Sequence, residues 1–179
     1  MKKEVRLLLL FLAFFLSLIF QTTIIPFFQL RGVVPDLLLV LIVFTALFYG
    51  AGAGGAAGFA VGFARDLLVG RCYGLQALSG FVAGYAVGCL EGKVFKENPL
   101  VSLFLVFSGS LLSGLIFLVG RGITGHSFFS LSLVWRDLIL GGLYNTLLAV
   151  FLFRPFTRLA APPAPPGVDP VRLFLDYRG

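Results

Sequence analysis

Glycine recurs at every fourth position in two stretches near the middle of the chain: Gly50, Gly54, Gly58 and Gly62, and then Gly80, Gly84, Gly88 and Gly92. Residues four apart lie above one another on a helix, so each series forms a smooth stripe along one helix face. In water each glycine would weaken a helix by about 1 kcal/mol. In lipid, where no hydrophobic force drives helices together, such stripes let two backbones approach closely. These two series, called here the glycine ladders, predict closely packed membrane helices.

The composition also indicates a membrane protein and excludes an ordinary soluble domain. Hydrophobic residues make up 59% of the chain and charged residues 12%, whereas soluble domains carry about 25% charged residues. The net charge of +6 does not indicate nucleic-acid binding, because Lys and Arg flank the apolar runs, as membrane topology requires. We therefore expect the lipid bilayer, and no nucleic acid, to surround the chain.

The apolar runs predict a compact, all-α bundle of six transmembrane helices. The first run follows Met1-Lys2-Lys3-Glu4 and has no small-residue cleavage site, so we interpret it as a retained helix and not as a signal peptide. The predicted spans are residues 5–25, 34–49, 53–69, 75–92, 99–119 and 131–153.

The stretch from Leu37 to Ala64 decides between five and six spans. As one uncharged helix it would be about 42 Å long, against a hydrocarbon core of about 30 Å. The cluster of glycine and alanine at residues 50–55 is the natural place for a turn. The distribution of Lys and Arg in the clear loops between the two sides of the membrane favours six spans over five. When Arg65 and Arg136 are also counted, the two models give the same distribution. We therefore choose six spans because of the length of the stretch, and five spans are the alternative.

Six spans place both termini on one side, and the positive-inside rule makes that side the cytoplasm. We expect residues 1–158 to form the transmembrane domain. After it the composition changes to a run of proline and alanine. Residues 159–179 are therefore predicted to form a Pro-rich cytoplasmic tail.

Charges inside the predicted spans are the main candidates for a functional site: Asp36, Arg65, Asp66, Arg136 and Asp137. Such charges usually pair with one another or face water. Helix rise places Asp36 and Arg65 at about the same height, so we expect an ion pair across the hairpin of spans 34–49 and 53–69. A substrate or ion site is the alternative interpretation. The polar intramembrane residues expected near this level are Gln21 and Gln76, and Asn145 lies in the last span.

Residues suited to catalysis are scarce. The sole histidine, His126, has no acidic or cysteine neighbour in the sequence, and neither Cys72 nor Cys89 has a metal-ligand neighbour. The sequence also lacks a nucleophile elbow and a phosphate-binding loop. We expect no catalytic residue, no metal and no cofactor, and hence no enzyme.

Several motifs, in order along the chain, resemble the family of the rod shape-determining protein MreD. They are Gln21-Thr22-Thr23, Pro35-Asp36-Leu37-Leu38-Leu39, the run from Gly58 to Gly70 that contains Arg65-Asp66, Gly74-Leu75-Gln76-Ala77-Leu78, and Tyr144-Asn145. The resemblance implies a non-enzymatic inner-membrane subunit of the bacterial cell-elongation machinery, the elongasome. Such a subunit binds the single-span protein MreC. It supports peptidoglycan synthesis by RodA and its penicillin-binding partner, under guidance from MreB filaments.

The MreD family is similar in turn to the substrate-binding S components of energy-coupling-factor vitamin transporters, which have six helices and a pocket. A substrate-binding subunit of a small-molecule importer is therefore the alternative function. The sequence does not determine the oligomeric state, and a homo-oligomer is possible.

A single-span partner needs a face for close packing, and the glycine ladders are the candidates. We expect the ladder from Gly80 to Gly92 to dock the partner, because the ladder from Gly50 to Gly62 would be covered within its own hairpin. Packing within the chain also explains both ladders, and it is the alternative to docking for the ladder from Gly80 to Gly92.

Overall fold

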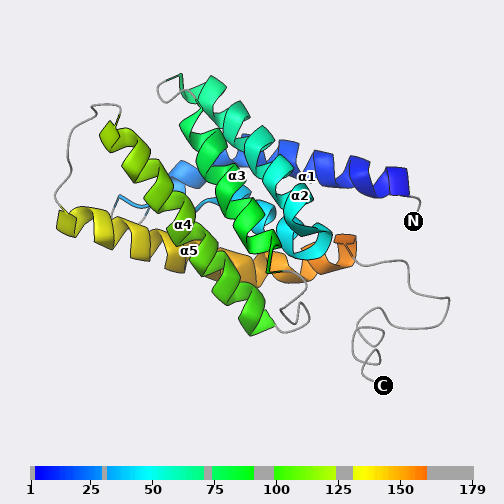
Figure 1. The fold of residues 1–179 in the computed structure, drawn as a ribbon. Helices are drawn as coiled ribbons and strands as arrows, with labels where there is room; N and C mark the ends of the chain where they lie inside the picture. The colour runs from blue at the N-terminus through cyan, green and yellow to red at the C-terminus, as the bar shows by residue number, and fades with distance from the viewer. Residues whose placement is uncertain (1–2, 30–31, 71–73, 91–98, 124–130, 161–179) are drawn as a thin grey trace.

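The computed structural model describes residues 3–29, 32–70, 74–90, 99–123 and 131–160, and the elements within them are helices joined by short non-helical segments such as residues 32–36 (Figure 1). The elements in order are α1 (Lys3–Thr23), the short 3-10 helix η1 (Ile25–Phe28), α2 (Leu37–Val69), α3 (Leu75–Gly88), α4 (Pro99–Ile123) and α5 (Leu131–Ala160). Three stretches in these residues are long and apolar enough to cross a membrane: Leu37–Leu68, Pro99–Ile123 and Leu138–Arg158. The predicted tail lies outside the described residues from position 161 onward.

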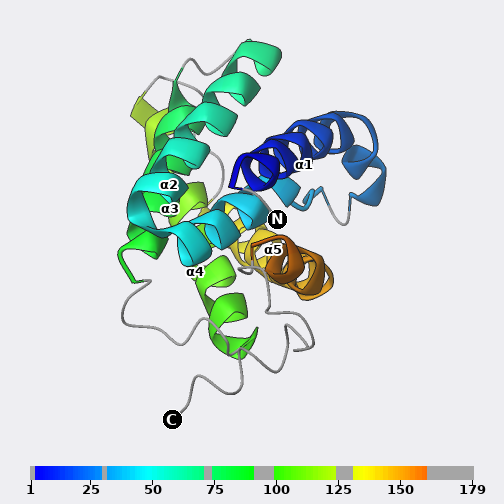
Figure 2. The ribbon, with the colours of Figure 1, turned by 90° about the vertical axis from the view of Figure 1, so that its right-hand side faces the viewer.

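The helix α2 is a hairpin whose two arms, residues 37–49 and 51–69, meet at Gly50. Gly50 has φ 87° and ψ 178°, a conformation that glycine adopts readily and other residues do not. The bend brings Arg65 to Asp36, with 2.6 Å between Nη1 and Oδ2. On a straight helix these two residues would lie about 43 Å apart. Figure 2 shows α2 changing direction between its blue-cyan and green-cyan parts.

The described residues form five α-helical elements, one fewer than the six expected, because α2 contains both the second and the third predicted span, joined at the non-helical Gly50. We expected a turn over residues 50–55 between two separate helices. Gly50 alone makes the reversal, and the helical element continues directly on both sides of it. A single residue in the left-handed region is sufficient, so no loop is needed and the second and third predicted spans are one bent element.

The two glycine ladders face each other across the contact between α2 and α3. A Cβ added at Gly54 would lie 2.6 Å from the carbonyl oxygen of Gly84, and one added at Gly80 would lie 2.6 Å from the carbonyl oxygen of Gly58. Real Cβ atoms do not come this close to a backbone, so only glycine permits this approach. Packing within the chain, the alternative interpretation of the ladders, is therefore confirmed for these positions.

The docking face that we expected on α3 was wrong for the same reason. Gly80, Gly84 and Gly88 are buried, and Gly88 lies against the backbone of α2 at Gly50 and Ala51. Along the described part of α3, the second arm of α2 already covers the glycine face, so no part of this face is exposed for a partner helix. Gly92 lies outside the described residues.

The first arm of α2 forms the centre of the bundle. Its residues from Leu38 to Leu47 are buried, and the ring of Phe44 packs against those of Phe153 and Phe156 at centroid distances of 6.0 and 5.3 Å. The sequence of this arm is apolar except for Thr45, whose hydroxyl donates to the carbonyl of Leu41, and such a sequence suits an arm that is covered on all sides. On the outside, α1 exposes large apolar side chains such as Phe11, as expected for a helix in contact with lipid.

Candidate functional site

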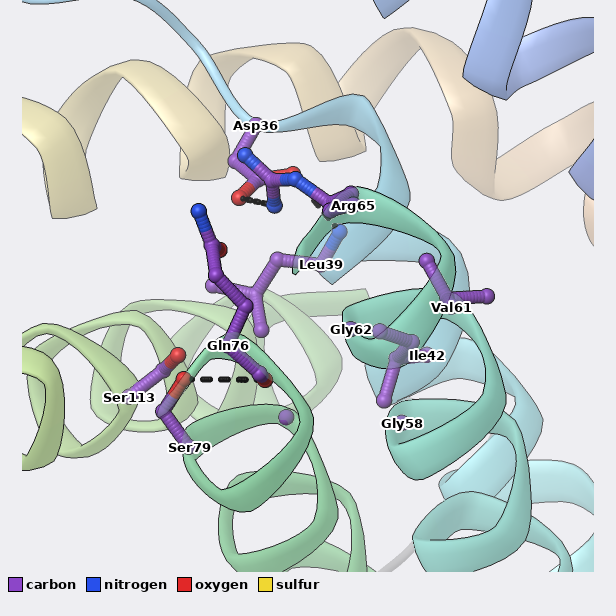
Figure 3. A pocket seen from close by; sticks show the side chains of 11 residues that line it. Asp36, Leu39, Ile42, Gly58, Val61, Gly62, Arg65, Gln76, Ser79 and Ser113 are labelled. Carbon is purple, nitrogen blue, oxygen red and sulfur yellow. Dashed lines mark hydrogen bonds and ion pairs between the residues drawn. The ribbon is translucent and has the colours of Figure 1, made fainter. Parts of the chain in front are cut away.

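Asp36 performs two tasks at the start of α2. Its Oδ1 accepts a hydrogen bond of 3.0 Å from the backbone N–H of Leu39, which makes it the N-cap of the helix. Its Oδ2 accepts the 2.6 Å bond from Nη1 of Arg65 (Figure 3). The expected ion pair across the hairpin is therefore present. About one quarter of each side chain is exposed, 24% for Arg65 and 23% for Asp36.

Asn145 connects this ion pair to α4 and α5. Its Oδ1 accepts the backbone N–H of Asp36 at 2.6 Å, and its Nδ2 donates to Oγ of Ser110 at 3.0 Å. The Ser110 hydroxyl in turn donates to the carbonyl of Val106 at 2.8 Å. Because Asn145 is buried, these bonds satisfy groups that would be costly to leave unpaired in the bundle.

Gln21 fixes the end of α1 to the start of α2. Its Nε2 donates to the carbonyl of Pro35, and its Oε1 accepts the backbone N–H of Leu37, both at 2.9 Å. The N–H groups in the first turn of a helix have no partner within the helix, so the amide of Gln21 supplies one. Gln21 thus lies beside the polar cluster, as the sequence predicted.

Asp66 has a role that the sequence analysis missed. Its carboxylate accepts the backbone N–H groups of Gln76 at 3.2 Å and of Ala77 at 3.0 Å, at the start of α3. The N-cap residue itself is Gly74, which has no side chain to cap the helix. A buried Asp66 carboxylate, 3% exposed, therefore satisfies the first turn of α3 and complements its dipole. The sequence signal for this role is an aspartate near the end of one helix, followed by a helix whose N-cap position has no capping side chain.

Gln76, Arg136 and Asp137 complete the set of predicted site residues. The amide of Gln76 extends toward the ion pair of Asp36 and Arg65 (Figure 3). Arg136 and Asp137 lie in the first part of α5, but their side chains are outside the described set, so their place in the cluster stays a prediction.

A cavity of about 220 Å³ adjoins the ion pair, between α2, α3, α4 and α5. Its polar border is formed by Asp36, Arg65, Gln76, Ser79, Ser110, Ser113 and Asn145, and its apolar border includes Phe117 and Leu138. Within the described ranges, no group of three or more His, Cys, Asp or Glu side chains is arranged to hold a metal ion. The cavity therefore presents hydrogen-bonding groups and one ion pair to a molecule bound in it.

The family model described as rod shape-determining protein MreD matches residues 1–159. The chain belongs to the MreD family. It is thus a membrane protein of a family that determines rod cell shape, and the resemblance drawn from the motifs is confirmed. No curated protein and no solved structure gives a significant match. The expected likeness to the S components of energy-coupling-factor transporters is not supported by a match to any solved structure.

Proposed function

We propose that this MreD-family protein is a non-enzymatic subunit of the bacterial cell-elongation machinery, which binds MreC in the inner membrane and supports peptidoglycan synthesis. The match to the family over residues 1–159 carries the proposal. The protein then associates with RodA, its penicillin-binding partner and the MreB filaments only indirectly, through MreC.

The tasks of the carboxylates at the site support a structural role. Asp36 caps α2 and pairs with Arg65, and Asp66 caps α3. General acid–base catalysis needs a group that is available to a reacting atom. These two carboxylates instead fix the relative positions of the helices, as expected of a rigid membrane subunit that presents a surface to partners.

We place the protein as a multi-pass inner-membrane protein with both termini in the cytoplasm. Because α2 reverses at Gly50, its two arms run in opposite directions, so the start of α1 and the end of α5 lie on one side. Figure 1 supports this arrangement, since the start of α1, the bend of α2 and the end of α5 are found at the same side of the bundle.

Co-purification tests the proposal directly. The tagged protein, extracted from its native membranes in mild detergent, should bring MreC with it, while an unrelated single-span protein of the same membrane should be absent. Depleting the protein should turn rod-shaped cells round. Extraction of a folded protein without MreC, together with unchanged rods after depletion, would contradict the proposal.

A further inference from the structure

The cavity beside Asp36 and Arg65 contains hydrogen-bonding capacity that the fold does not use. Arg65 engages Asp36 through Nη1, and its other guanidinium N–H groups form no bond to the described residues. The side chains of Gln76 and Ser113 likewise make no hydrogen bond within the described part of the chain, although both border the cavity. Polar groups inside a bundle of membrane helices usually face water, a ligand or one another.

These free groups are mainly donors. A guanidinium has five N–H donors and no acceptor, an amide adds two donors and one acceptor oxygen, and a hydroxyl adds one donor and one acceptor oxygen. Figure 3 shows the Gln76 amide directed toward the ion pair, with Ser113 on the facing helix α4. A ligand that fits them must therefore be rich in acceptor oxygens, as a phosphoryl group is.

The charge of the cavity sets a second requirement. Its two described charges, Asp36 and Arg65, cancel each other. A bare anion would leave an uncompensated negative charge next to the Asp36 carboxylate, which is costly away from water. A ligand that carries its own cation avoids that cost, and an ammonium group would be attracted to the carboxylate.

The size and the apolar border of the cavity limit the ligand further. Its volume of about 220 Å³ is below the ~300–1,000 Å³ typical of pockets for drug-sized molecules. It is sufficient for a small polar head group. The aromatic ring of Phe117 and the side chain of Leu138 on the same border would suit the hydrocarbon part of a lipid.

We propose that this cavity binds a zwitterionic phosphodiester group with a primary ammonium, of the phosphoethanolamine type. The phosphoryl oxygens accept hydrogen bonds from the free N–H groups of Arg65, from the Gln76 amide and from the Ser113 hydroxyl. The ammonium lies on the side of Asp36. The group comes either from the head group of a membrane lipid or from a soluble molecule of the same chemistry. The inference is independent of the proposed binding of MreC.

Thermal unfolding of the full-length protein in detergent tests the proposal, because a ligand that binds only the folded state raises the midpoint. Short-chain phosphatidylethanolamine should raise it, whereas phosphatidylglycerol, which has no ammonium, should not. Soluble glycerophosphoethanolamine, a zwitterionic phosphodiester with the same primary ammonium, is the further arm. A shift with it supports a soluble source as well as a lipid source, and a shift with the lipid alone supports the lipid source.

Ser113→Leu provides the matched variant, because it fills the cavity and breaks no hydrogen bond among the described residues. Ser108→Leu is its control, the same change on the same helix α4 at a position that does not border the cavity. We expect Ser113→Leu to weaken lipid binding by about tenfold or more, since a bond to a charged group is lost and the space is filled. The control should keep the full shift.

If Ser113→Leu does not fold, Gln76→Leu takes its place, since the Gln76 side chain also forms no bond to a described residue. Two results would overturn the proposal. One is an equal midpoint shift in the wild type and in the folded cavity variant. The other is no response to phosphatidylethanolamine beyond that to phosphatidylglycerol, in which case the cavity holds only water.

Discussion

Replacing Gly58 with alanine measures what the close approach of α2 and α3 contributes to stability. The new Cβ would overlap the carbonyl group of Gly80, and a backbone cannot move aside as the end of a flexible side chain can. The two helices must separate, and overpacking of this kind typically costs about 1–3 kcal/mol. Alanine also favours a helix over glycine by about 1 kcal/mol, so the variant alone would understate the effect.

Gly52→Ala removes that ambiguity, because a Cβ at Gly52 meets nothing within 4 Å. It lies on the same arm of α2 and carries the same gain in helix propensity. The difference between the two variants therefore isolates the steric cost, and we expect Gly58→Ala to be about 1–3 kcal/mol less stable than Gly52→Ala. Gly55→Ala should fall between them, since its Cβ would lie 3.1 Å from the ring of Phe81, a side chain that can shift.

Unfolding of the three purified variants in mixed micelles, followed by circular dichroism, gives their free energies of unfolding. The expected order of stability is Gly52→Ala, Gly55→Ala, Gly58→Ala, from highest to lowest. Equal stability of the first and the last would refute the reasoning, since it would mean that α2 and α3 do not depend on backbone contact.

Three further predictions concern the ion pair, the cap of α3 and the topology. Asp36→Asn keeps a capping oxygen but removes the charge, so this variant and Arg65→Leu should each lower the free energy of unfolding by about 1–3 kcal/mol. The double variant should lower it by clearly less than the sum of the two. Simple additivity would show that the residues are not energetically coupled. Asp66→Ala should cost about 1–2 kcal/mol and raise hydrogen exchange in the first turn of α3, an effect that unchanged exchange there would contradict. In a cysteine-free background, a cysteine at Ser127 should react with an impermeant reagent on intact cells and one at Ala161 should not, whereas labelling at Ala161 from outside would place the C-terminus on the outer face.

The ion pair between Asp36 and Arg65 could be predicted from the sequence because helix rise is nearly constant. Once a turn is placed near Gly50, the distances from it to Asp36 and to Arg65 determine that the two side chains reach the same height. The helix count could not be predicted with the same certainty. It depends on whether a reversal takes a loop or one residue, and both fit a segment this rich in glycine.

The partner of each ladder could not be read from the spacing. A repeat of four makes one helix face smooth, but the face is the same whether a neighbouring helix or a separate protein covers it. The roles of Asp66 and Asn145 were missed for a related reason. Asp66 caps α3 only because the start of α3 lies beside the end of α2, and Asn145 contacts the backbone N–H of Asp36, 109 residues away in the sequence. Both contacts depend on tertiary packing.

The ladders and the cavity should therefore respond differently to substitution in a cell. The ladders join α2 to α3, so a larger side chain at Gly58 or Gly84 lowers the amount of folded protein, and any change in cell shape follows from that loss. The cavity borders carry free hydrogen-bonding groups that the fold does not need, so a change at Ser113 or Gln76 should leave the amount of protein nearly constant. A defect in cell shape at a constant protein level would then result from the altered cavity. A defect that scales with the protein level would result from disrupted packing of α2 against α3. Measuring both in the same cells separates a role in folding from a role in function.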